Sequence, residues 1–256
     1  MQHRNYLIGA AILAASLGTA TGASAQSIVA LSSNTLTFVD AKSMKTTATV
    51  KINGGNVIGI DVRPADGMLY GVTDNGWIVT IDPKSGKLTQ KAEMSTKLKT
   101  SAGATIDFNP AADRLRVMSP DGTNLRVNVD DGKVIEDGKL KFAENDMHKG
   151  ETPNVVAGAY TNSVKGTKET VLYDIDATIG ALLRQAPPND GVLNAVGKLG
   201  FKVNGPVAFN IVAKGEGQND AWLSHAGTLY KVDLKTGKAT PAGKIPAGVT
   251  DIAYMD

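Results

Sequence analysis

Three aspartates occupy matching positions in segments of the chain that resemble one another. They lie in the runs Ile60-Asp61-Val62, Ile106-Asp107-Phe108 and Thr250-Asp251-Ile252. Side chains two residues apart lie on the same face of a strand. The alignment therefore adds the polar residues two positions later in such segments, namely Arg63, Asn109 and Asn210.

If the similar segments are arranged around one axis, their three aspartates lie close together and could do two kinds of chemistry. Asp61, Asp107 and Asp251 could bind a divalent cation, of which calcium is the candidate, through hard oxygen ligands. They could instead divide acid and base roles, as paired carboxylates do in glycoside hydrolysis. The alternative is structural, with each carboxylate hydrogen-bonded to the backbone of a neighbouring repeat.

Two further groups are candidates for ligand binding. Arg114 and Arg116 alternate on one strand face and could hold an anion through paired hydrogen bonds, or be neutralised by nearby acids such as Asp107 or Asp113. Asn189 and Asp190 lie in a Pro-Pro-Asn-Asp-Gly excursion, which is either a binding loop on a rigid scaffold or a stiff connection.

A recurring phrase indicates the architecture that must position these residues. Short alternating segments end at Asp40, Asp82, Val129, Asp176 and Asp233, and a Gly-containing turn follows most of them. Their spacing of 42 to 57 residues is in or just beyond the range of four-stranded propeller blades. In the clearest unit, four short strands run over 57–61, 68–72, 77–82 and 87–92.

The fold class predicted from this pattern is all-β, a five-bladed β-propeller with the N- and C-terminal strands completing one blade. The expected first strand at 249–254 has no followers, whereas 27–31 and 35–40 lack a predecessor. Closing the ring this way removes exposed sheet edges. A sandwich of short strands is the alternative, but it leaves the split repeat unexplained.

The first 25 residues form a separate segment. Arg4 precedes an apolar run, and Ala23-Ser24-Ala25 places small residues at a cleavage site. This pattern predicts a secretory signal peptide over 1–25, a single propeller domain over 26–256, and an exported protein, periplasmic or extracellular. A membrane anchor is the alternative. The run is shorter than the ~20 residues a spanning helix needs, so we expect no membrane span after cleavage.

Composition narrows the function classes. The formal net charge is only +2 and basic residues are interspersed with acidic ones, so nucleic acid is not an expected partner. Cysteine is absent, which leaves neither disulfides nor thiol chemistry. The run Asn128-Val129-Asp130-Asp131-Gly132 faintly suggests a calcium loop, or a turn whose side chains bond their own backbone.

Several of these phrases together resemble a known family. The run Asn109-Pro110-Ala111-Ala112-Asp113-Arg114-Leu115-Arg116 and the run Pro187-Pro188-Asn189-Asp190-Gly191 are its most specific features, with Leu172-Tyr173-Asp174-Ile175-Asp176 beside them. The chain resembles an exported bacterial family, domain of unknown function 4394, across the mature sequence. The resemblance implies a secreted propeller-like domain and transfers no activity or catalytic residue.

Two functions of different classes are compatible with the sequence. The favoured one is a non-catalytic binding or scaffold domain, because a closed scaffold carries variable loops and no complete catalytic set. Its partner is a small molecule, a glycan or an exported protein, with no cofactor expected apart from calcium. The alternative is a glycan-directed or metal-assisted hydrolase that uses Asp61, Asp107 and Asp251 at the mouth of the central channel of the propeller.

Overall fold

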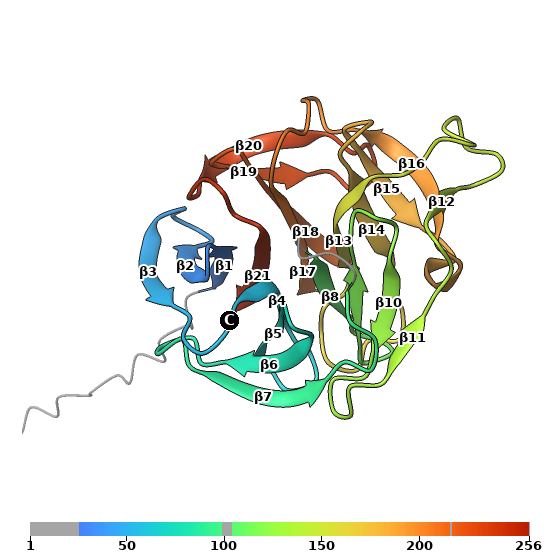
Figure 1. The fold of residues 1–256 in the computed structure, drawn as a ribbon. Helices are drawn as coiled ribbons and strands as arrows, with labels where there is room; N and C mark the ends of the chain where they lie inside the picture. Colours follow the sequence, from blue (N-terminus) through green and yellow to red (C-terminus); the bar gives the residue numbers. More distant parts are fainter. Residues whose placement is uncertain (1–25, 99–103, 216, 256) are drawn as a thin grey trace, which may run out of the picture.

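The computed structural model describes residues 26–98, 104–215 and 217–255. Over this part of the chain, five sheets stand in a ring around a central channel (Figure 1). The prediction of a five-bladed propeller is confirmed. The expected signal peptide over 1–25 lies outside the described residues. No helix in the described ranges is long and apolar enough to cross a membrane.

The strands of the first three blades run from the channel outward. Blade I contains β21 (Asp251–Met255), β1 (Ser27–Ser32), β2 (Thr35–Asp40) and β3 (Thr46–Lys51). Blade II contains β4 (Val57–Val62), β5 (Leu69–Thr73), β6 (Trp77–Ile81) and β7 (Leu88–Glu93). Blade III contains β8 (Thr105–Asn109), β9 (Arg114–Met118), β10 (Asn124–Val127) and β11 (Val134–Glu136).

Blade IV has a fifth strand, and the two inner strands of blade V are long. Blade IV contains β13 (Val155–Tyr160), β14 (Leu172–Asp176), β15 (Ala181–Gln185), β16 (Val192–Lys198) and, parallel to β16 at its edge, β12 (Lys141–Phe142). A short 3-10 helix, η1 (Pro188–Asp190), precedes β16. Blade V contains β17 (Val207–Gly215), β18 (Gln218–His225), β19 (Thr228–Val232) and β20 (Ala239–Lys244).

Blade I combines strands from the two ends of the described chain, as predicted. Strand β21 pairs antiparallel with β1, with Asp251 opposite Leu31 and Met255 opposite Ser27. Figure 1 shows β21, at the red end of the colour scale, lying beside the blue strands of this blade. Pairing the late strand with the early ones covers the edges that both would otherwise expose.

Apolar packing between blades holds the ring together. The inner strand β4 is buried along five of its six residues, whereas the outer strand β3 is mostly exposed. Between blades II and III, Tyr70 and Phe108 meet edge to face with ring centroids 5.3 Å apart. Each fully buried side chain of this size stabilises the fold by roughly 1.5–3 kcal/mol relative to an exposed one.

The repeated Asp-to-Gly turn is structural. The Oδ1 atom of Asp82 accepts hydrogen bonds from the backbone N–H groups of Lys84 and Ser85, at 3.0 and 2.7 Å. Gly86 then adopts a left-handed conformation with φ of 68°, which glycine reaches without strain. The turn at Asp233 repeats these bonds. The recurring aspartates therefore close hairpins between strands.

One copy of the phrase does not occupy the expected position. The copies ending at Asp40, Asp82, Val129 and Asp233 belong to the third strands of their blades, but the copy ending at Asp176 is β14, a second strand. The spacing from Asp to Gly does not show whether a second or a third strand precedes the turn. The hairpins after both strands can close on a turn of this kind.

Candidate functional site

Carboxyl groups on inner strands join neighbouring blades across the channel wall. The Asp61 Oδ2 atom of blade II accepts a 2.7 Å hydrogen bond from the Phe108 N–H of blade III. The Asp107 Oδ1 atom of blade III accepts a 2.8 Å bond from the Tyr160 N–H of blade IV. One oxygen of each carboxyl therefore has a structural role, as the structural interpretation of the sequence requires.

Asp251 lies deeper than the sequence alignment suggests. Its Oδ2 atom accepts from the N–H of Ile60, the residue before Asp61, and its Oδ1 atom accepts from Ile252. Thr105 makes the corresponding contact from blade III, with its Oγ1 atom accepting from Gly158 at 3.0 Å. Asp251 thus matches Thr105, one inward-facing position before Asp107, and both of its oxygens are bonded to backbone.

Asn210 brings Asp61 and Asp107 together from the far side of the ring. Its Nδ2 atom lies 3.3 Å from Asp61 Oδ1 and 3.4 Å from Asp107 Oδ2. We call these three side chains the channel floor. They lie at the bottom of a cavity of about 360 Å³, the channel cavity, to which Asp251 does not contribute.

Burial controls the protonation of the channel carboxyls. Removal from water raises the pKa of Asp61 to about 7, against the lowering effect of the N–H donors from Phe108, Val62 and Asn210. Burial, followed by the nearby Asp61 charge, raises the pKa of Asp107 well above its ordinary value. Burial does the same for Asp251. Asp61 can therefore exchange a proton near neutral pH.

The predicted three-aspartate calcium site is not assembled as the sequence suggested. Within the described ranges, no group of three or more His, Asp or Glu side chains is arranged to hold a metal ion. Asp251 uses both oxygens on backbone donors, one step away from the other two carboxyls. Binding of calcium to this protein stays a prediction.

Arg63 closes one side of the channel cavity and also fastens blade II to blade III. Its Nε and Nη2 atoms donate to Asp113 at 2.8 and 2.6 Å, and its Nη1 and Nη2 atoms donate to Asp130 at 3.1 and 3.2 Å. The bonds from Arg63 lower the pKa of Asp113. With its donors engaged by two carboxylates, Arg63 forms part of the wall of the cavity.

Arg116 is the centre of a second buried network, which we call the Arg116 cluster. It is 1% exposed and donates to Tyr160 Oη, Asn124 Oδ1, Asp137 Oδ2 and Asn189 Oδ1, at 2.6 to 3.1 Å. Arg126 donates two further bonds to Asp137. The acids named from the sequence as partners of this arginine pair, Asp107 and Asp113, are thus not those that hold Arg116.

The remaining candidates lie apart from the channel floor. Asn109 accepts bonds from Ala111 and Ala112 and closes its turn, while Arg114 donates to the Asp113 carbonyl at 2.8 Å. Asn189 joins the Arg116 cluster from η1, and its neighbour Asp190 is exposed. The loop over 185–191 therefore contributes a structural contact to blade III.

Sequence reasoning missed Asp137 and Asp174. Asp137 follows β11 without any motif, and only the excess of arginines on β9 and β10 hinted at a nearby acid. Asp174 on β14 is completely buried, and neither carboxyl oxygen has a hydrogen-bond partner among the described residues. Burial raises its pKa to about 8. Its place within the repeated Leu-Tyr-Asp-Ile-Asp phrase concealed it.

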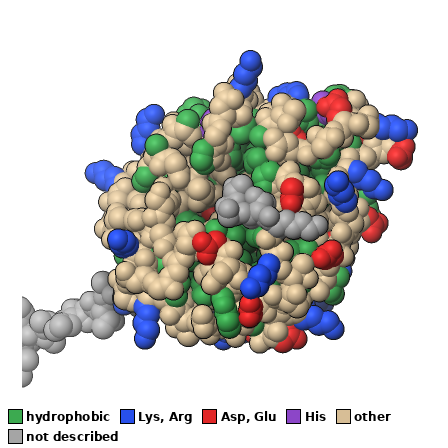
Figure 2. All heavy atoms as spheres, in the orientation of Figure 1, with side chains coloured by type: hydrophobic (Ala, Val, Ile, Leu, Met, Phe, Trp, Pro, Cys, Tyr) green, Lys and Arg blue, Asp and Glu red, His purple; other side chains and the backbone are tan. Residues whose placement is uncertain are grey.

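The expected surface character agrees with the structure. Figure 2 shows basic and acidic side chains interspersed around one face, with no block of a single sign. The run from Asn128 to Gly132 is a turn, because Asn128 and Asp131 accept bonds from the backbone of Asp130 and Lys133.

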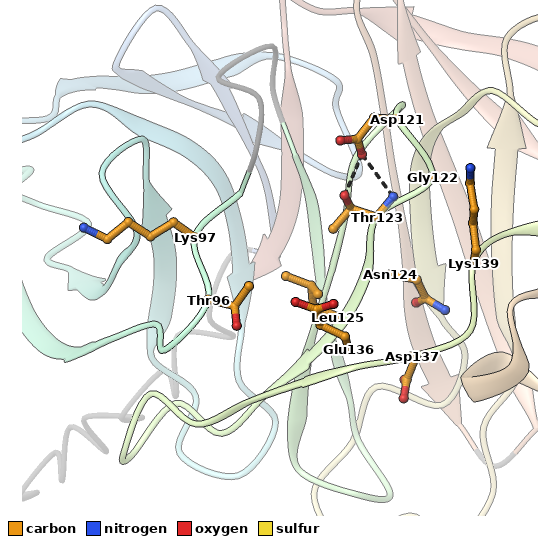
Figure 3. Close-up of a pocket in the computed structure, with 10 residues that line it drawn as sticks. All are labelled: Thr96, Lys97, Asp121, Gly122, Thr123, Asn124, Leu125, Glu136, Asp137 and Lys139. Carbon is orange, nitrogen blue, oxygen red and sulfur yellow. Dashed lines mark hydrogen bonds between the residues drawn. The ribbon is translucent and has the colours of Figure 1, made fainter.

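A hollow of about 260 Å³ beside blade III contains several charged groups that already have partners (Figure 3). Asp121 accepts from the N–H and Oγ1 of Thr123, and Asp137 belongs to the Arg116 cluster. Lys97 extends away from the hollow in Figure 3 and pairs with Glu93 at 2.9 Å. We therefore regard this hollow as a weaker candidate than the channel cavity.

Comparison with protein families gives one match. The profile of the family described as "Domain of unknown function (DUF4394)" matches residues 35–253, which include blades II to V and part of blade I. No curated protein matches the chain.

Two of the similar solved structures are proteins of unknown function. A structural genomics protein from Bacteroides thetaiotaomicron superposes with a TM-score of 0.53 at 15% identity, over 82% of this chain and 53% of that chain. A protein from Bacteroides caccae gives a TM-score of 0.45 at 12% identity, over 86% of this chain and 73% of that one. The chain thus spans about half the length of the first relative, and that likeness concerns the fold alone.

Proposed function

The chain belongs to the DUF4394 family, whose function is unknown, and from this premise we propose that it is an exported, non-catalytic binding domain that takes a small ligand in the channel cavity. The observation that carries the proposal is the convergence of Asp61, Asp107 and Asn210 at the bottom of that cavity. A concave site with a few convergent polar groups and perturbed pKa values is the usual form of a ligand pocket.

The walls of the cavity support this proposal. Apolar residues from blades I, II and V and from the loop after β13 line it beside the polar floor, among them Val62, Val164, Ile211, Val212 and Met255. Such a lining allows a ligand to bury apolar surface while the floor selects its polar end. Its volume of about 360 Å³ is near the lower end for ligand pockets, so the ligand is a small molecule or one unit of a larger chain.

The proposal is tested by filling the cavity. Ala213 lies in its lining, and Ala213→Met adds a side chain there, whereas Ala111→Met makes the same change on an exposed turn. The unfolding midpoints of both variants and the unaltered protein are measured against a panel of sugars, amines and amino acids. A ligand at one hundred times its dissociation constant stabilises by about 2.7 kcal/mol. We expect stabilisation that Ala213→Met abolishes and Ala111→Met retains; a ligand that stabilises all three equally contradicts the site.

A glycan-directed hydrolase is the second candidate, favoured by one observation. The carboxyls of Asp61 and Asp107 share Asn210, and the pKa of Asp61 is about 7, which suits a general acid. The test is release of reducing ends from a panel of glycans. Activity lost in Asp61→Asn at unchanged folding would favour the hydrolase over the binding domain.

A further inference from the structure

The channel floor has more hydrogen-bond acceptors than donors. Asp61 Oδ1 and Asp107 Oδ2 share one amide group, Asn210 Nδ2, over long contacts of 3.3 and 3.4 Å. Asn210 Oδ1 accepts no hydrogen bond from any described residue, although Asn210 is only 6% exposed and lines the cavity. Three oxygen atoms on buried side chains are therefore poorly supplied with donors.

Among the described residues, cationic side chains do not fill this deficit. The guanidinium of Arg63 is held by Asp113 and Asp130, on the wall of the cavity. Lys165 also contributes to the lining, but its residue is exposed. Within the described part of the chain, the carboxyls of Asp61 and Asp107 therefore have no cation as a direct partner.

We propose that the channel floor binds the primary ammonium group of a small alkylamine, whose aliphatic chain lies against the apolar wall; this identification of the ligand class rests on the function proposed above. A primary ammonium carries three N–H donors and no acceptor. Its donors match Asp61 Oδ1, Asp107 Oδ2 and Asn210 Oδ1 one to one.

Other ligand chemistries fit the floor less well. A calcium ion takes six to eight oxygen ligands, and the floor offers three poorly supplied oxygens. A hydroxyl group brings one donor together with acceptor lone pairs that the floor cannot satisfy. A quaternary ammonium has the charge without the N–H donors. The apolar residues Val62, Val164 and Met255 suit an alkyl chain.

Binding of an ammonium group should depend on pH. Burial raises the pKa of Asp61 to about 7 and that of Asp107 well above its ordinary value, so both carboxyls hold protons in mildly acidic solution. A bound cation favours their ionised forms and lowers both pKa values. Affinity then rises with pH through neutrality, and the protein releases protons on binding.

The experiment titrates the purified full chain with n-butylamine, butan-1-ol and tetramethylammonium at pH 8 and pH 5. Methyl NMR shifts of Ile211 and Val164 report occupancy of the cavity, and calorimetry in two buffers of different ionisation enthalpy reports released protons. We expect butylamine alone to shift both methyl signals, with affinity about tenfold or more lower at pH 5 and proton release at pH 8. Equal affinity for butan-1-ol or tetramethylammonium, or affinity independent of pH, overturns the proposal.

Matched carboxyl variants assign the effect to the floor. Asp61→Asn and Asp107→Asn each remove one charged acceptor and should weaken butylamine about tenfold or more, the range for a charged hydrogen bond. Asp190→Asn makes the same change at an exposed residue that does not line the cavity and should leave the affinity unchanged. Equal weakening by all three variants contradicts the floor as the site, and two floor variants that fold but bind normally contradict it as well.

The outcomes separate this proposal from the proposed function. If butylamine leaves the methyl signals unchanged at pH 8 while a neutral sugar shifts them, and Ala213→Met abolishes that shift, the cavity binds ligands and the ammonium assignment is wrong. If no member of the panel shifts the methyl signals of Ile211 and Val164, both proposals are wrong.

Discussion

The Arg116 cluster and the channel floor are built from the same kinds of side chain and differ in how completely they are satisfied. In the cluster, the cations Arg116 and Arg126 share the buried carboxylate of Asp137 over distances of 2.6 to 2.9 Å. In the floor, the carboxyls of Asp61 and Asp107 share one neutral amide group over contacts longer than 3.2 Å.

This difference separates structural groups from candidate binding groups. A buried ion pair with good geometry is costly to break, because removal of one partner leaves an uncompensated charge. Burial raises the pKa of a carboxyl that has no cation beside it, as it does for Asp61. The groups of the cluster thus satisfy one another, whereas the proposed ligand would bring charge and donors to the floor.

The largest expected effect tests the cluster. Arg116→Met removes the donors that hold Asp137, Asn124 and Asn189, so we expect the free energy of unfolding to fall by about 3 kcal/mol. Denaturant unfolding measures it, with Arg114→Met as the control on the same strand. Pairing Arg116→Met with Asp137→Leu should recover part of the loss, and a double variant no more stable than the single one contradicts an ion-pair origin.

The second effect concerns buried carboxyls without a cation. Burial raises the folded-state pKa of Asp174 to about 8 and that of Asp61 to about 7, whereas the unfolded chain has the ordinary value of 3.8. The folded state then binds more protons between about pH 4 and pH 8, so stability is greatest below this window and is lost as pH rises through it. Each such carboxyl contributes roughly 1.4 kcal/mol per pH unit.

Asp174→Asn isolates one part of this pH dependence. The amide is neutral at every pH, so we expect the variant to lose less stability than the unaltered protein between pH 5 and pH 8. Unfolding free energies at pH 5, 6, 7 and 8 measure the difference. Parallel curves for the two proteins are the contrary result.

A smaller effect tests the packing that brings Asp174 next to the inner strand. A Cβ atom on Gly158 would lie 2.5 Å from Asp174 Oδ1 and 2.6 Å from Met118 Cε. Overpacking of this kind costs typically 1–3 kcal/mol, so Gly158→Ala should lower the unfolding free energy by about 2 kcal/mol. Combining it with Asp174→Ala should relieve most of the loss; additive losses in the double variant contradict the predicted contact.

The smallest expected effect concerns Arg63, whose carboxylate partners are more accessible than Asp137. The side chains of Asp113 and Asp130 are 39% and 60% exposed, so solvent screens these ion pairs. We expect Arg63→Met to lower the unfolding free energy by about 1 kcal/mol and the loss to shrink in high salt. A loss as large as that of Arg116→Met would show that exposure does not distinguish the two arginines.

Much of the fold could be predicted from the sequence because propeller strands are short, alternating and bounded by marked turns. Strand β2 begins and ends where the pattern predicts, over 35–40. The clasp of β21 with β1 followed from a blade split between the two ends of the chain. Blade IV was less predictable, because its repeated phrase lies on the second strand and β12 adds an unforeseen parallel pairing.

The candidate site could be predicted only in part. Alternation placed Asp61, Asp107 and Asn210 on inward-facing positions, and the structure brings these three together. The same alignment placed Asp251 level with Asp61 and Asp107, but it lies one inward-facing position earlier. An aspartate at either position can accept a hydrogen bond from the backbone of the next blade, so residue type alone does not distinguish them. The partners of Arg116 come from a loop and a strand end, where no periodicity locates a side chain.

One pair of matched substitutions tests most directly whether the channel floor and the Arg116 cluster differ in their contribution to stability. Asp107→Asn and Asp137→Asn make the same change on the channel floor and in the Arg116 cluster, and both are compared with the unaltered protein by denaturant unfolding at pH 8. The account predicts a loss of about 3 kcal/mol for Asp137→Asn, which leaves two arginines without their carboxylate, and a loss below about 1 kcal/mol for Asp107→Asn. Equal losses, or a larger one at Asp107, would contradict the claim that the floor is held for a ligand and the cluster for the fold.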